Sequence, residues 1–220
     1  GFPDIKSANE EILLITVKEL STKRIITFGS KTYVNPREDV IYVNCKDEQA
    51  LLTQFLEFWS KSHPDVITGW NTDFFDMPYL IRRIERELGD GESNKLSPWG
   101  YVNERKTFIK GNEEIHYDIL GISQLDYLEL YKKYTYTKQE SYRLDNIAQV
   151  ELGEGKLDYD EYDNLNALYR LNFQKFIEYN IKDVELIIKL EDKLKLVELA
   201  VTLAYDTKSN FEDVFAQTRM

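Results

Sequence analysis

The sequence predicts an α/β protein in which a mixed β-sheet is flanked by helices. Residues 11–43 contain three short runs rich in β-branched and aromatic residues, ILLITV, RIITFG and VIYVN, separated by polar turns. This spacing is typical of an antiparallel meander. Further along the chain, helical and strand-like patterns alternate, an order that packs helices onto the faces of a sheet. Both observations therefore indicate the same α/β class.

The elements expected after the meander follow from local signals. Asp47 has the residue type and position of a helix N-cap, and the apolar spacing that follows predicts a helix through Ser60. A buried strand is then expected at 66–67, a loop at 70–76, and a helix at 78–88 that Gly89 closes. A β-hairpin is expected at about 104–119, with its turn at Gly111-Asn112. A strand at 122–125 should lead into the helical segment DYLELYKKY, which Asp126 could cap. A short helix from about Ser141 to Val150 and helix from Asn164 nearly to the end complete the expected elements.

Composition restricts the chemistry that the chain can perform. Hydrophobic residues make up 42% of the chain, as in folded globular proteins, and the formal net charge is −11. One cysteine and two histidines cannot build a zinc site, so any metal must be bound by oxygen. The negative charge argues against general nucleic-acid affinity, which depends on lysine and arginine. Either the excess carboxylates hold metal ions, or nucleic acid is held mostly by other parts of the protein.

Targeting signals are not evident in the sequence. Nothing resembles a signal peptide, and the apolar runs are far shorter than the roughly 18 residues of a membrane span, so we expect no membrane partner. The chain begins at Gly1 without an initiator methionine, which indicates that upstream residues have been removed.

Two groups of residues are candidates for a metal site. The segment Asn71 to Asp76 lies between a predicted strand and a predicted helix, where loops of α/β proteins carry active groups. Asp76 could bind metal there, although an N-cap is the commoner role for an aspartate in this position. Tyr179 and Asp183 are four residues apart in a predicted helix and therefore share one face. An exposed tyrosine beside a solvated aspartate would give the same pattern.

The order of these groups resembles a known family. A strand-loop-helix with Asn-x-x-x-Phe-Asp, followed about a hundred residues later by a helical Tyr-x-x-x-Asp, is similar to the second and third exonuclease motifs of family B DNA polymerases. The segments ITGWNTDFFDMPYLIRRI, LGISQLDYLELYKKYTYT, SYRLDNIAQ and YNIKDVELI resemble consecutive parts of T-even-type bacteriophage replicative polymerases. The resemblance covers nearly the whole chain.

This resemblance implies an RNase H-like 3′→5′ exonuclease fold with a protruding β-hairpin. It implies that Asp76 and Asp183 are two of four acidic ligands for two Mg²⁺ or Mn²⁺ ions, and that Tyr179 orients the attacking water. Hard carboxylates suit these ions better than zinc. Asn71 and Phe75 would contact the substrate.

The chain also departs from the family pattern. The first exonuclease motif, Asp-x-Glu, should lie just upstream of a Gly-Phe-Pro segment, and here Gly1-Phe2-Pro3 opens the chain. We therefore expect an incomplete ligand set and an inactive or impaired fragment. The expected domain spans residues 1–205, truncated at its N-terminus, and residues 206–220 would begin the connection to the polymerase palm. No palm motif follows, so polymerisation is not expected of this chain.

Further residues could contact DNA. Relatives carry a Gly-Lys whose lysine approaches the exonuclease site, which makes Lys156 a candidate phosphate contact; a plain turn lysine is an equal alternative. The Gly-Glu-Gly-Lys around it lacks the spacing of a Walker motif. Arg105, Lys106 and Lys110 give the predicted hairpin a basic character, and the hairpin resembles the one that helps part primer from template. Segment 131–143 mixes cations with tyrosines, as single-strand binding grooves do, although half-buried tyrosines of a solvated loop would look the same.

The expected partners follow from the same resemblance. They are DNA as a single-stranded 3′ end or primer–template, the remainder of the polymerase chain, and a sliding clamp, in the cytoplasm of a host cell if the origin is a phage. Two alternatives remain open at this point. One is a stand-alone RNase H-like nuclease, which predicts a complete Asp-x-Glu strand. The other is a non-catalytic nucleic-acid-binding module that keeps its motifs as relics.

Overall fold

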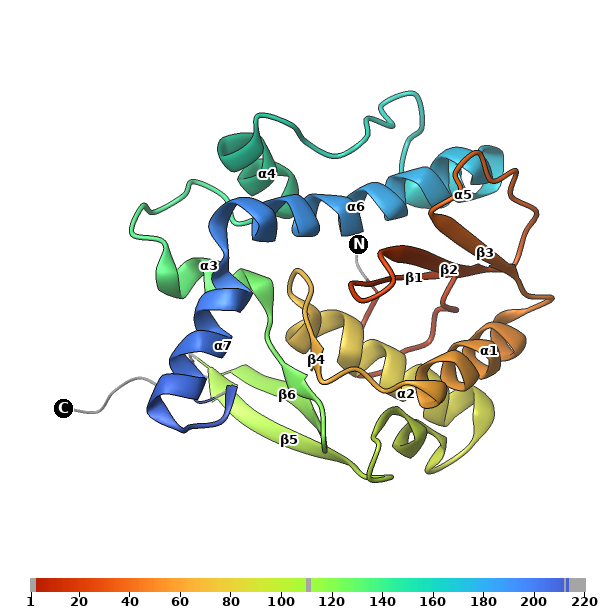
Figure 1. Cartoon of the computed structure of the whole chain (residues 1–220). Coiled ribbons are helices and arrows are strands. Elements are labelled where there is room, and N and C mark those ends of the chain that lie inside the picture. The colour runs from red at the N-terminus through yellow and green to blue at the C-terminus, as the bar shows by residue number, and fades with distance from the viewer. Residues whose placement is uncertain (1–2, 110–111, 212, 214–220) are drawn as a thin grey trace. The chain divides into compact units, whose positions relative to one another are not determined.

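Two compact units make up the chain in the computed structural model, which describes residues 3–109, 112–211 and 213 (Figure 1). The first unit combines Gly1–Glu11, Leu56–Lys138 and Leu194–Met220, and the second combines Ile12–Phe55 and Gln139–Lys193. Each unit is therefore assembled from segments that are distant in the sequence.

A three-stranded sheet forms the centre of the second unit. Its strands are β1 (Leu14–Glu19), β2 (Arg24–Gly29) and β3 (Val40–Asn44), in the order β1-β2-β3. β1 and β2 are antiparallel, as the sequence predicts, whereas β2 and β3 are parallel. The predicted antiparallel meander is therefore wrong at its third strand.

The length of the β2–β3 connection explains this difference. A parallel neighbour requires the chain to return to the starting end of the strand, and such crossovers usually take a dozen or more residues. Strands of five or six residues are only about 17–20 Å long. Segment 30–39, at up to about 3.3 Å per residue, can cover this distance without a helix. The polar residues of this segment fit both a tight turn to an antiparallel strand and a crossover to a parallel one, so they did not indicate the direction of β3.

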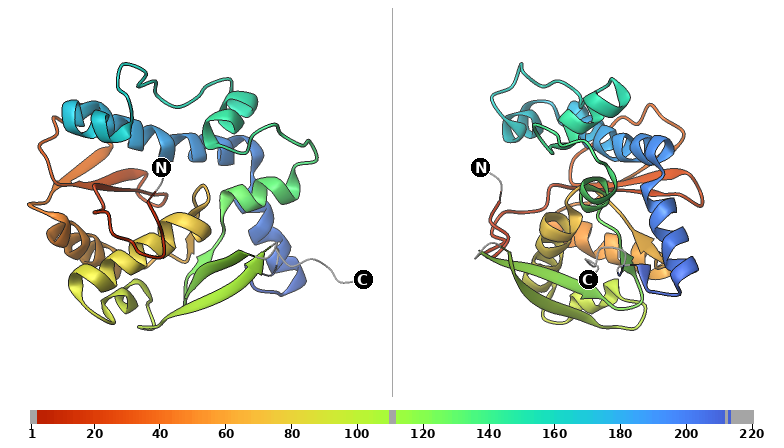
Figure 2. Two further views of the ribbon diagram at one scale, coloured as in Figure 1. Left: turned by 180° about the vertical axis from the view of Figure 1, so that it is seen from behind. Right: turned by 90° about the vertical axis from the view of Figure 1, so that its left-hand side faces the viewer.

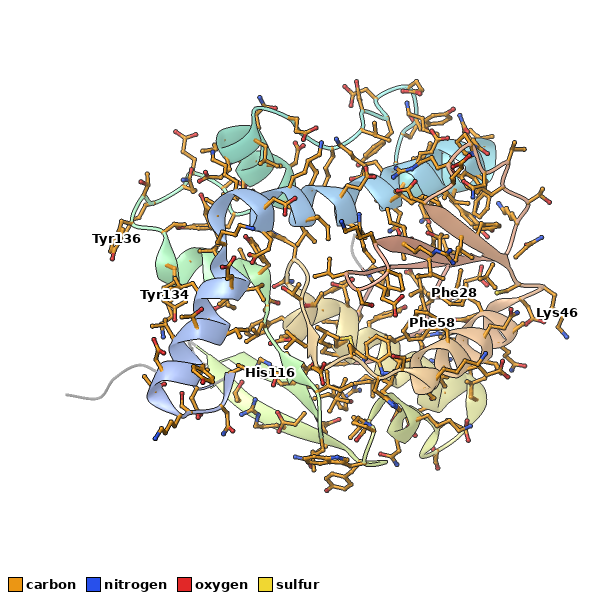
Figure 3. The ribbon with its side chains drawn as sticks, in the orientation of Figure 1. Phe28, Lys46, Phe58, His116, Tyr134 and Tyr136 are labelled. Atoms are coloured by element: carbon orange, nitrogen blue, oxygen red, sulfur yellow. The ribbon has the colours of Figure 1, made fainter. Side chains whose placement is uncertain are left out.

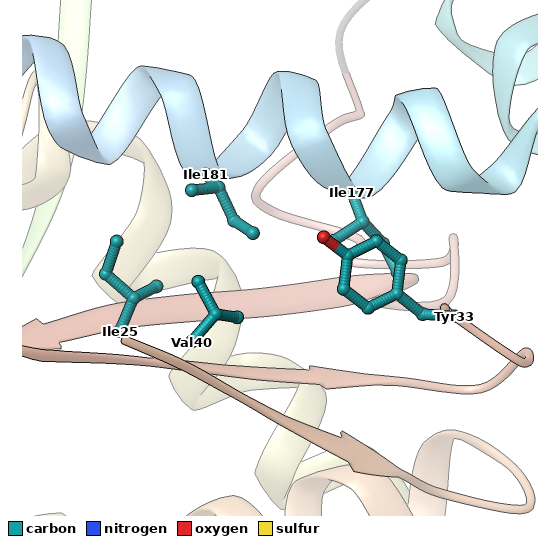
Figure 4. Packing of buried hydrophobic residues seen from close by; sticks show 5 residues of the cluster. All are labelled: Ile25, Tyr33, Val40, Ile177 and Ile181. Atoms are coloured by element: carbon teal, nitrogen blue, oxygen red, sulfur yellow. The ribbon is translucent and has the colours of Figure 1, made fainter. Parts of the chain in front are cut away.

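Helices cover both faces of this sheet. On one face, the long helix α6 (Phe173–Leu194) packs through Ile177 and Ile181 against Ile25 and Val40, and Tyr33 completes the cluster (Figure 4). On the other face, an edge-to-face contact joins Phe28 of β2 to Phe55 of helix α1 (Glu48–Lys61), with ring centroids 5.7 Å apart. Because successive side chains of a strand alternate between faces, β2 is buried on both sides, which explains its continuous apolar run.

The remaining helices of the second unit are α4 (Leu144–Leu152) and α5 (Leu165–Leu171). The predicted N-cap of α1 is confirmed, since Asp47 Oδ1 accepts a hydrogen bond from the backbone N–H of Ala50 at 2.8 Å. The predicted cap Ser141 is not the N-cap of α4; that position belongs to Arg143.

The first unit is built around a short parallel ladder of β4 (Val66–Ile67) and β7 (Ser123–Gln124). The strand predicted as buried at 66–67 is half-buried. A single turn of π-helix, η1 (Thr72–Asp76), replaces the predicted loop and leads directly into α2 (Met77–Leu88). A 3₁₀ turn, η2 (Glu92–Leu96), follows α2.

The predicted hairpin is present as β5 (Val102–Ile109) and β6 (Asn112–Ile119), a long two-stranded ribbon (Figure 2). Ile109 pairs with Asn112, so Asn112 belongs to a strand and not to the turn that the sequence predicts at Gly111-Asn112. Lys110 and Gly111 lie outside the described residues. β6 packs against α2 and η1.

Two helices complete the first unit. α3 (Tyr127–Tyr134) follows β7 and packs against α7 (Leu196–Thr207). Residues 214–220, which belong to the predicted connection to the palm, lie outside the described residues. Among the helices that the structure describes, none has the length and apolar character to cross a membrane.

The α/β class with mixed strand directions and flanking helices is confirmed. The described strands are divided among a three-stranded sheet and two two-stranded sheets. The candidate residues of the first unit follow the end of β4, which pairs with β7. In the second unit, Tyr179 and Asp183 lie on α6, which packs on the mixed sheet.

Two leucines of α5 test how far burial determines the stability of the second unit. Leu168 is fully buried and Leu171 is 76% exposed, so the same substitution can be compared in one helix. Leu168→Ala should lower the free energy of unfolding by about 2–5 kcal/mol, because it leaves a cavity. Leu171→Ala should change it by less than about 0.5 kcal/mol. Urea titration measures both; equal losses would contradict the described packing of α5.

Candidate functional site

The end of β4 is joined to the end of β7 by a continuous series of hydrogen bonds. Three backbone bonds extend the parallel pairing beyond the two strands, from Ser123 N–H to Asp65 C=O at 2.9 Å, Leu125 N–H to Ile67 C=O at 2.9 Å and Tyr127 N–H to Gly69 C=O at 2.8 Å. The Thr68 hydroxyl adds a bond to the Leu125 carbonyl at 2.6 Å. The chain that leaves β4 is therefore held against the chain that leaves β7.

Gly69 is required by the tightness of the turn that follows. A Cβ atom at this position would lie 2.2 Å from Cγ2 of Thr72, closer than real Cβ contacts allow. Two residues later Asn71 adopts a left-handed conformation, with φ 64°. Asparagine tolerates this region better than most residues, although the conformation still costs about 1 kcal/mol or more. The turn therefore needs stabilising contacts from elsewhere.

Asp126 supplies these contacts. Its side chain is 1% exposed and accepts hydrogen bonds from the backbone N–H groups of Asn71 at 3.2 Å and Asp73 at 3.1 Å. It also caps α3 by accepting from Leu128 at 2.9 Å and Glu129 at 3.3 Å. Burial raises the pKa of the Asp126 carboxyl, and the four N–H donors oppose this effect by stabilising its charge. The predicted capping role is confirmed, and the contacts with Asn71 and Asp73 are additional to it.

Asp76 stands where η1 meets α2. It occupies the N-cap position of α2, but its side chain makes no capping hydrogen bond, and the residue is exposed. The common structural reason for an aspartate in this position is therefore missing here. A π-type turn is itself frequent at functional sites.

Aromatic contacts fix the two phenylalanines of η1. Phe75 stacks on Tyr79 of α2 with ring centroids 6.1 Å apart, and Phe74 meets His116 of β6 edge-on at 4.5 Å (Figure 3 labels His116). The turn that carries Asp76 is thus fixed to both α2 and the hairpin.

In the second unit, the structure brings three predicted residues together. Lys156 Nζ lies 2.6 Å from Asp183 Oδ2 and 5.2 Å from the centre of the Tyr179 ring. Tyr179 and Asp183 are both on α6, and the Tyr159 ring packs edge-on against Tyr179 at 5.3 Å. The side chains of Lys156 and Asp183 are only 26% and 24% exposed. Lys156 is therefore not a plain turn lysine.

The segment that carries Lys156 is fixed to α6 and α4. Glu154 accepts from Lys182 at 2.7 Å and from Lys189 at 2.5 Å, two lysines of α6. Asp145 of α4 accepts from the Lys156 backbone N–H at 2.7 Å. A Cβ on Gly155 would lie 2.5 Å from Asp145 Oδ1, so glycine permits this close approach.

The charges of this cluster depend on burial and on each other. Burial raises the pKa of the Asp183 carboxyl, and the Lys156 ammonium opposes the effect. Burial acts to lower the pKa of Lys156, but the charge and hydrogen bond of Asp183, together with the contribution of Tyr179, outweigh it, and that pKa is raised. Burial also raises the pKa of the Tyr179 hydroxyl. Lys156 is consequently a cation and Tyr179 a neutral hydroxyl at neutral pH.

The donor set suits a hard cation. Asp183 Oδ1 is buried and has no hydrogen-bond partner, although Oδ2 is paired with Lys156. A buried carboxylate oxygen without a partner is costly, and coordination of a cation would satisfy it. Among the described residues no group of three or more His, Cys, Asp or Glu side chains could hold a metal ion. Asp76 belongs to the first unit and Asp183 to the second.

One of the basic residues predicted for the hairpin has an acidic neighbour. Arg105 forms an ion pair with Asp118 of β6 at 3.1 Å. Lys106 is exposed, and Lys110 lies outside the described residues. At the base of the hairpin, Tyr117 is joined to Glu104 at 2.8 Å and to Arg82 of α2 at 3.1 Å, which fixes β6 to the helix.

The tyrosines of segment 131–143 differ in exposure. Tyr131 is fully buried, Tyr134 and Tyr142 are half-buried, and Tyr136 is completely exposed (Figure 3). Only Tyr136 therefore presents its whole ring to solvent among these four.

Comparison with known proteins places the chain in a family. Residues 3–147 match the family described as DNA polymerase family B, exonuclease domain. The chain belongs to this family. It is 37% identical to the DNA-directed DNA polymerase of Escherichia phage RB69, over 81% of this chain and 20% of that protein. It is 36% identical to the DNA-directed DNA polymerase of Enterobacteria phage T4, over 80% of this chain and 20% of that protein.

A more distant relative is also much longer than the stretch that this chain matches. The DNA polymerase of Orgyia pseudotsugata multicapsid polyhedrosis virus is 28% identical over 73% of this chain and 16% of that protein. The family B exonuclease domain described here thus spans about a fifth of the length of the phage relatives it matches. Exonucleases of this family generally depend on divalent metal ions, as the sequence predicts.

Sequence reasoning missed two features of the site. The sequence identifies Asp126 as a helix cap but does not reveal its bonds to Asn71 and Asp73, which form because the ends of neighbouring parallel strands meet at one sheet edge. It also overlooked Asp145, which holds the backbone of Lys156. Neither feature has a local sequence signal, because the partners are far apart in the chain.

The close approach of Gly69 and Thr72 gives a test of the turn geometry. Gly69→Ala should lower the free energy of unfolding by about 1–3 kcal/mol, because the new methyl group overpacks against Thr72 Cγ2. Thr72→Ser removes that methyl group and keeps the hydroxyl, so the double variant should recover most of the loss. Urea titration of the four proteins forms a double-mutant cycle. A coupling energy near zero would show that the two residues do not meet.

Proposed function

We propose that this family B exonuclease domain removes mispaired 3′-terminal nucleotides within a phage-type replicative DNA polymerase. The observation that carries the proposal is the convergence of Tyr179, Lys156 and Asp183 around a buried carboxylate oxygen that has no partner. The family match supports the same chemistry. A non-catalytic module does not account for the unsatisfied oxygen, and a stand-alone nuclease does not account for the match to DNA polymerases.

Asp76 and Asp183 are the proposed metal ligands. Two Mg²⁺ or Mn²⁺ ions would lower the pKa of a bound water and stabilise the charge that develops on the scissile phosphate. Two carboxylates are too few for such a pair, because hard cations need several oxygen ligands. We propose that an Asp-x-Glu motif of the polymerase, outside this chain, supplies the remaining ones.

The other residues of the site bind and orient. The Tyr179 hydroxyl, neutral at neutral pH, is placed one helical turn from Asp183 and can orient the attacking water by hydrogen bonding. The Lys156 ammonium beside Asp183 can contact a phosphate oxygen. In the first unit, Asn71 and Phe75 flank Asp76 in the turn and are proposed to contact the terminal nucleotide.

The partners of the domain follow from this assignment. They are the single-stranded 3′ end or primer–template junction of DNA, the rest of the polymerase chain and, through that chain, a sliding clamp. Arg105 and Lys106 of the hairpin are proposed DNA contacts. The host cytoplasm is the proposed site of action.

Substitution of the proposed ligands tests the assignment in a full-length polymerase that carries this domain. Asp76→Ala and Asp183→Ala should each lower single-strand exonuclease turnover by at least about a hundredfold, because metal ions supply several kcal/mol of charge stabilisation and about 1.4 kcal/mol corresponds to tenfold in rate. Tyr179→Phe should cost less, since it removes one hydrogen bond. Polymerisation should be unchanged in all three.

Asp192→Ala is the matched control, since Asp192 is an exposed aspartate of the same helix as Asp183. Circular dichroism checks that each variant is folded. Wild-type turnover in either Asp76→Ala or Asp183→Ala would refute the proposed metal site.

Trimming the hairpin tests whether it helps to unpair the primer end. Ile115 is buried and His116 contacts Phe74, so a tight turn should replace residues 107–114 only. Excision from duplex primers should then slow, while digestion of single strands should be nearly unchanged, because only the duplex requires unpairing at a cost of a few kcal/mol. The measurement is the ratio of the two rates at fixed salt. An unchanged ratio would rule out this role of the hairpin.

A further inference from the structure

Asp126 makes more contacts than a helix cap requires. Within the first unit, Oδ1 accepts from Leu128 and Glu129 of α3, which satisfies the first turn of that helix. The same oxygen also accepts from Asn71 at 3.2 Å, and Oδ2 accepts from Asp73 at 3.1 Å. One buried carboxylate therefore binds two segments that are more than fifty residues apart in the chain.

The second segment is the one that carries Asp76. Asn71 is the residue before η1 and has the left-handed conformation, and Asp73 lies within η1, which ends at Asp76. With Tyr127 N–H bonded to Gly69 C=O, the segment 69–73 is attached to 126–127 at three consecutive points. The path of the chain into Asp76 is therefore set by Asp126 from the neighbouring strand end.

We propose that Asp126 is a positioning residue for the exonuclease site, which holds the η1 turn so that Asp76 is oriented for metal binding. This inference rests on the proposed role of Asp76 as a ligand. Residues that orient metal ligands typically change metal affinity or activity by about 10–100-fold when they are substituted. Asp126 itself is 1% exposed and touches neither substrate nor metal in this role.

Replacement of the Asp126 carboxylate by the carboxamide of asparagine should separate its two functions, the cap of α3 and the support of η1. Asparagine caps helices as well as aspartate does. In Asp126→Asn the amide oxygen can keep the place of Oδ1 and its three donors, which leaves the amide NH₂ facing the N–H of Asp73, where an acceptor is needed. The variant should therefore keep the cap of α3 and lose the bond to η1.

Asp47→Asn is the matched control. Asp47 caps α1 through one bond from Ala50 and is exposed, and its other contact is a surface ion pair with the neighbouring Lys46 at 3.5 Å. The same substitution there therefore tests a cap that holds no distant segment. Asp76→Ala serves as the reference for loss of a proposed ligand.

The experiment compares these three variants with the wild-type full-length polymerase. Three quantities are measured: Mn²⁺ binding by electron paramagnetic resonance, the Mg²⁺ concentration for half-maximal single-strand exonuclease activity, and polymerase activity with thermal unfolding. Asp126→Asn should weaken Mn²⁺ binding at the exonuclease site and raise the half-maximal Mg²⁺ concentration by about 10–100-fold. Polymerase activity should match that of Asp47→Asn. The unfolding temperature should be a few degrees lower than that of Asp47→Asn, because the N–H of Asp73 loses its acceptor.

Three results would overturn the inference. Metal dependence of Asp126→Asn equal to that of Asp47→Asn, with Asp76→Ala inactive, would refute the positioning role and leave the proposed function intact. Parallel losses of exonuclease activity, polymerase activity and unfolding temperature in Asp126→Asn would reduce Asp126 to a structural residue. Wild-type metal binding and exonuclease activity in Asp76→Ala would refute the proposed function and this inference together.

Discussion

The buried carboxylate of Asp126 is the interaction on which the first unit depends. A charged group in the interior is costly unless hydrogen bonds compensate it, and here four backbone N–H groups do so. Two of these donors begin α3 and two lead into η1, so the position of one element determines that of the other. The arrangement also offsets the left-handed conformation of Asn71, which would be unfavourable in an isolated turn.

In the second unit, apolar contacts position the helix that carries two of the candidate residues. Ile177 and Ile181 fix α6 on the sheet, and Tyr179 and Asp183 project from the same helix. Ion pairs of Glu154 and Lys156 then attach the loop to α6. The Glu154 pairs are partly exposed and contribute little to stability, whereas the Lys156–Asp183 pair is mostly buried. The apolar face therefore positions the helix, and the ion pairs select the path of the loop. Side chains on a rigid helix are well suited to a site that requires fixed geometry.

The negative charge of the chain is compatible with the proposed action on DNA only if other groups contribute to the binding of phosphates. A net charge of −11 repels phosphates, and Arg105, a proposed DNA contact, is paired with Asp118. Metal ions at the proposed ligands Asp76 and Asp183 would reverse the local charge at each of these carboxylates. The phage relatives are about five times longer than the stretch this chain matches, which leaves ample protein for holding DNA in a polymerase.

The sequence by itself determined the α/β class, most helices and the hairpin, because capping residues and apolar periodicity are local signals. It also determined the family, because the short motifs around Asp76 and around Tyr179 and Asp183 occur in the family's order. It did not determine the direction of β3, because polar residues in segment 30–39 fit a turn and a crossover equally well. Nor did it show that Asp126 binds Asn71 and Asp73, or that Lys156 meets Asp183. These contacts join residues that are distant in the chain, and they exist only because tertiary packing brings parallel strand ends together in one unit and folds the loop onto α6 in the other.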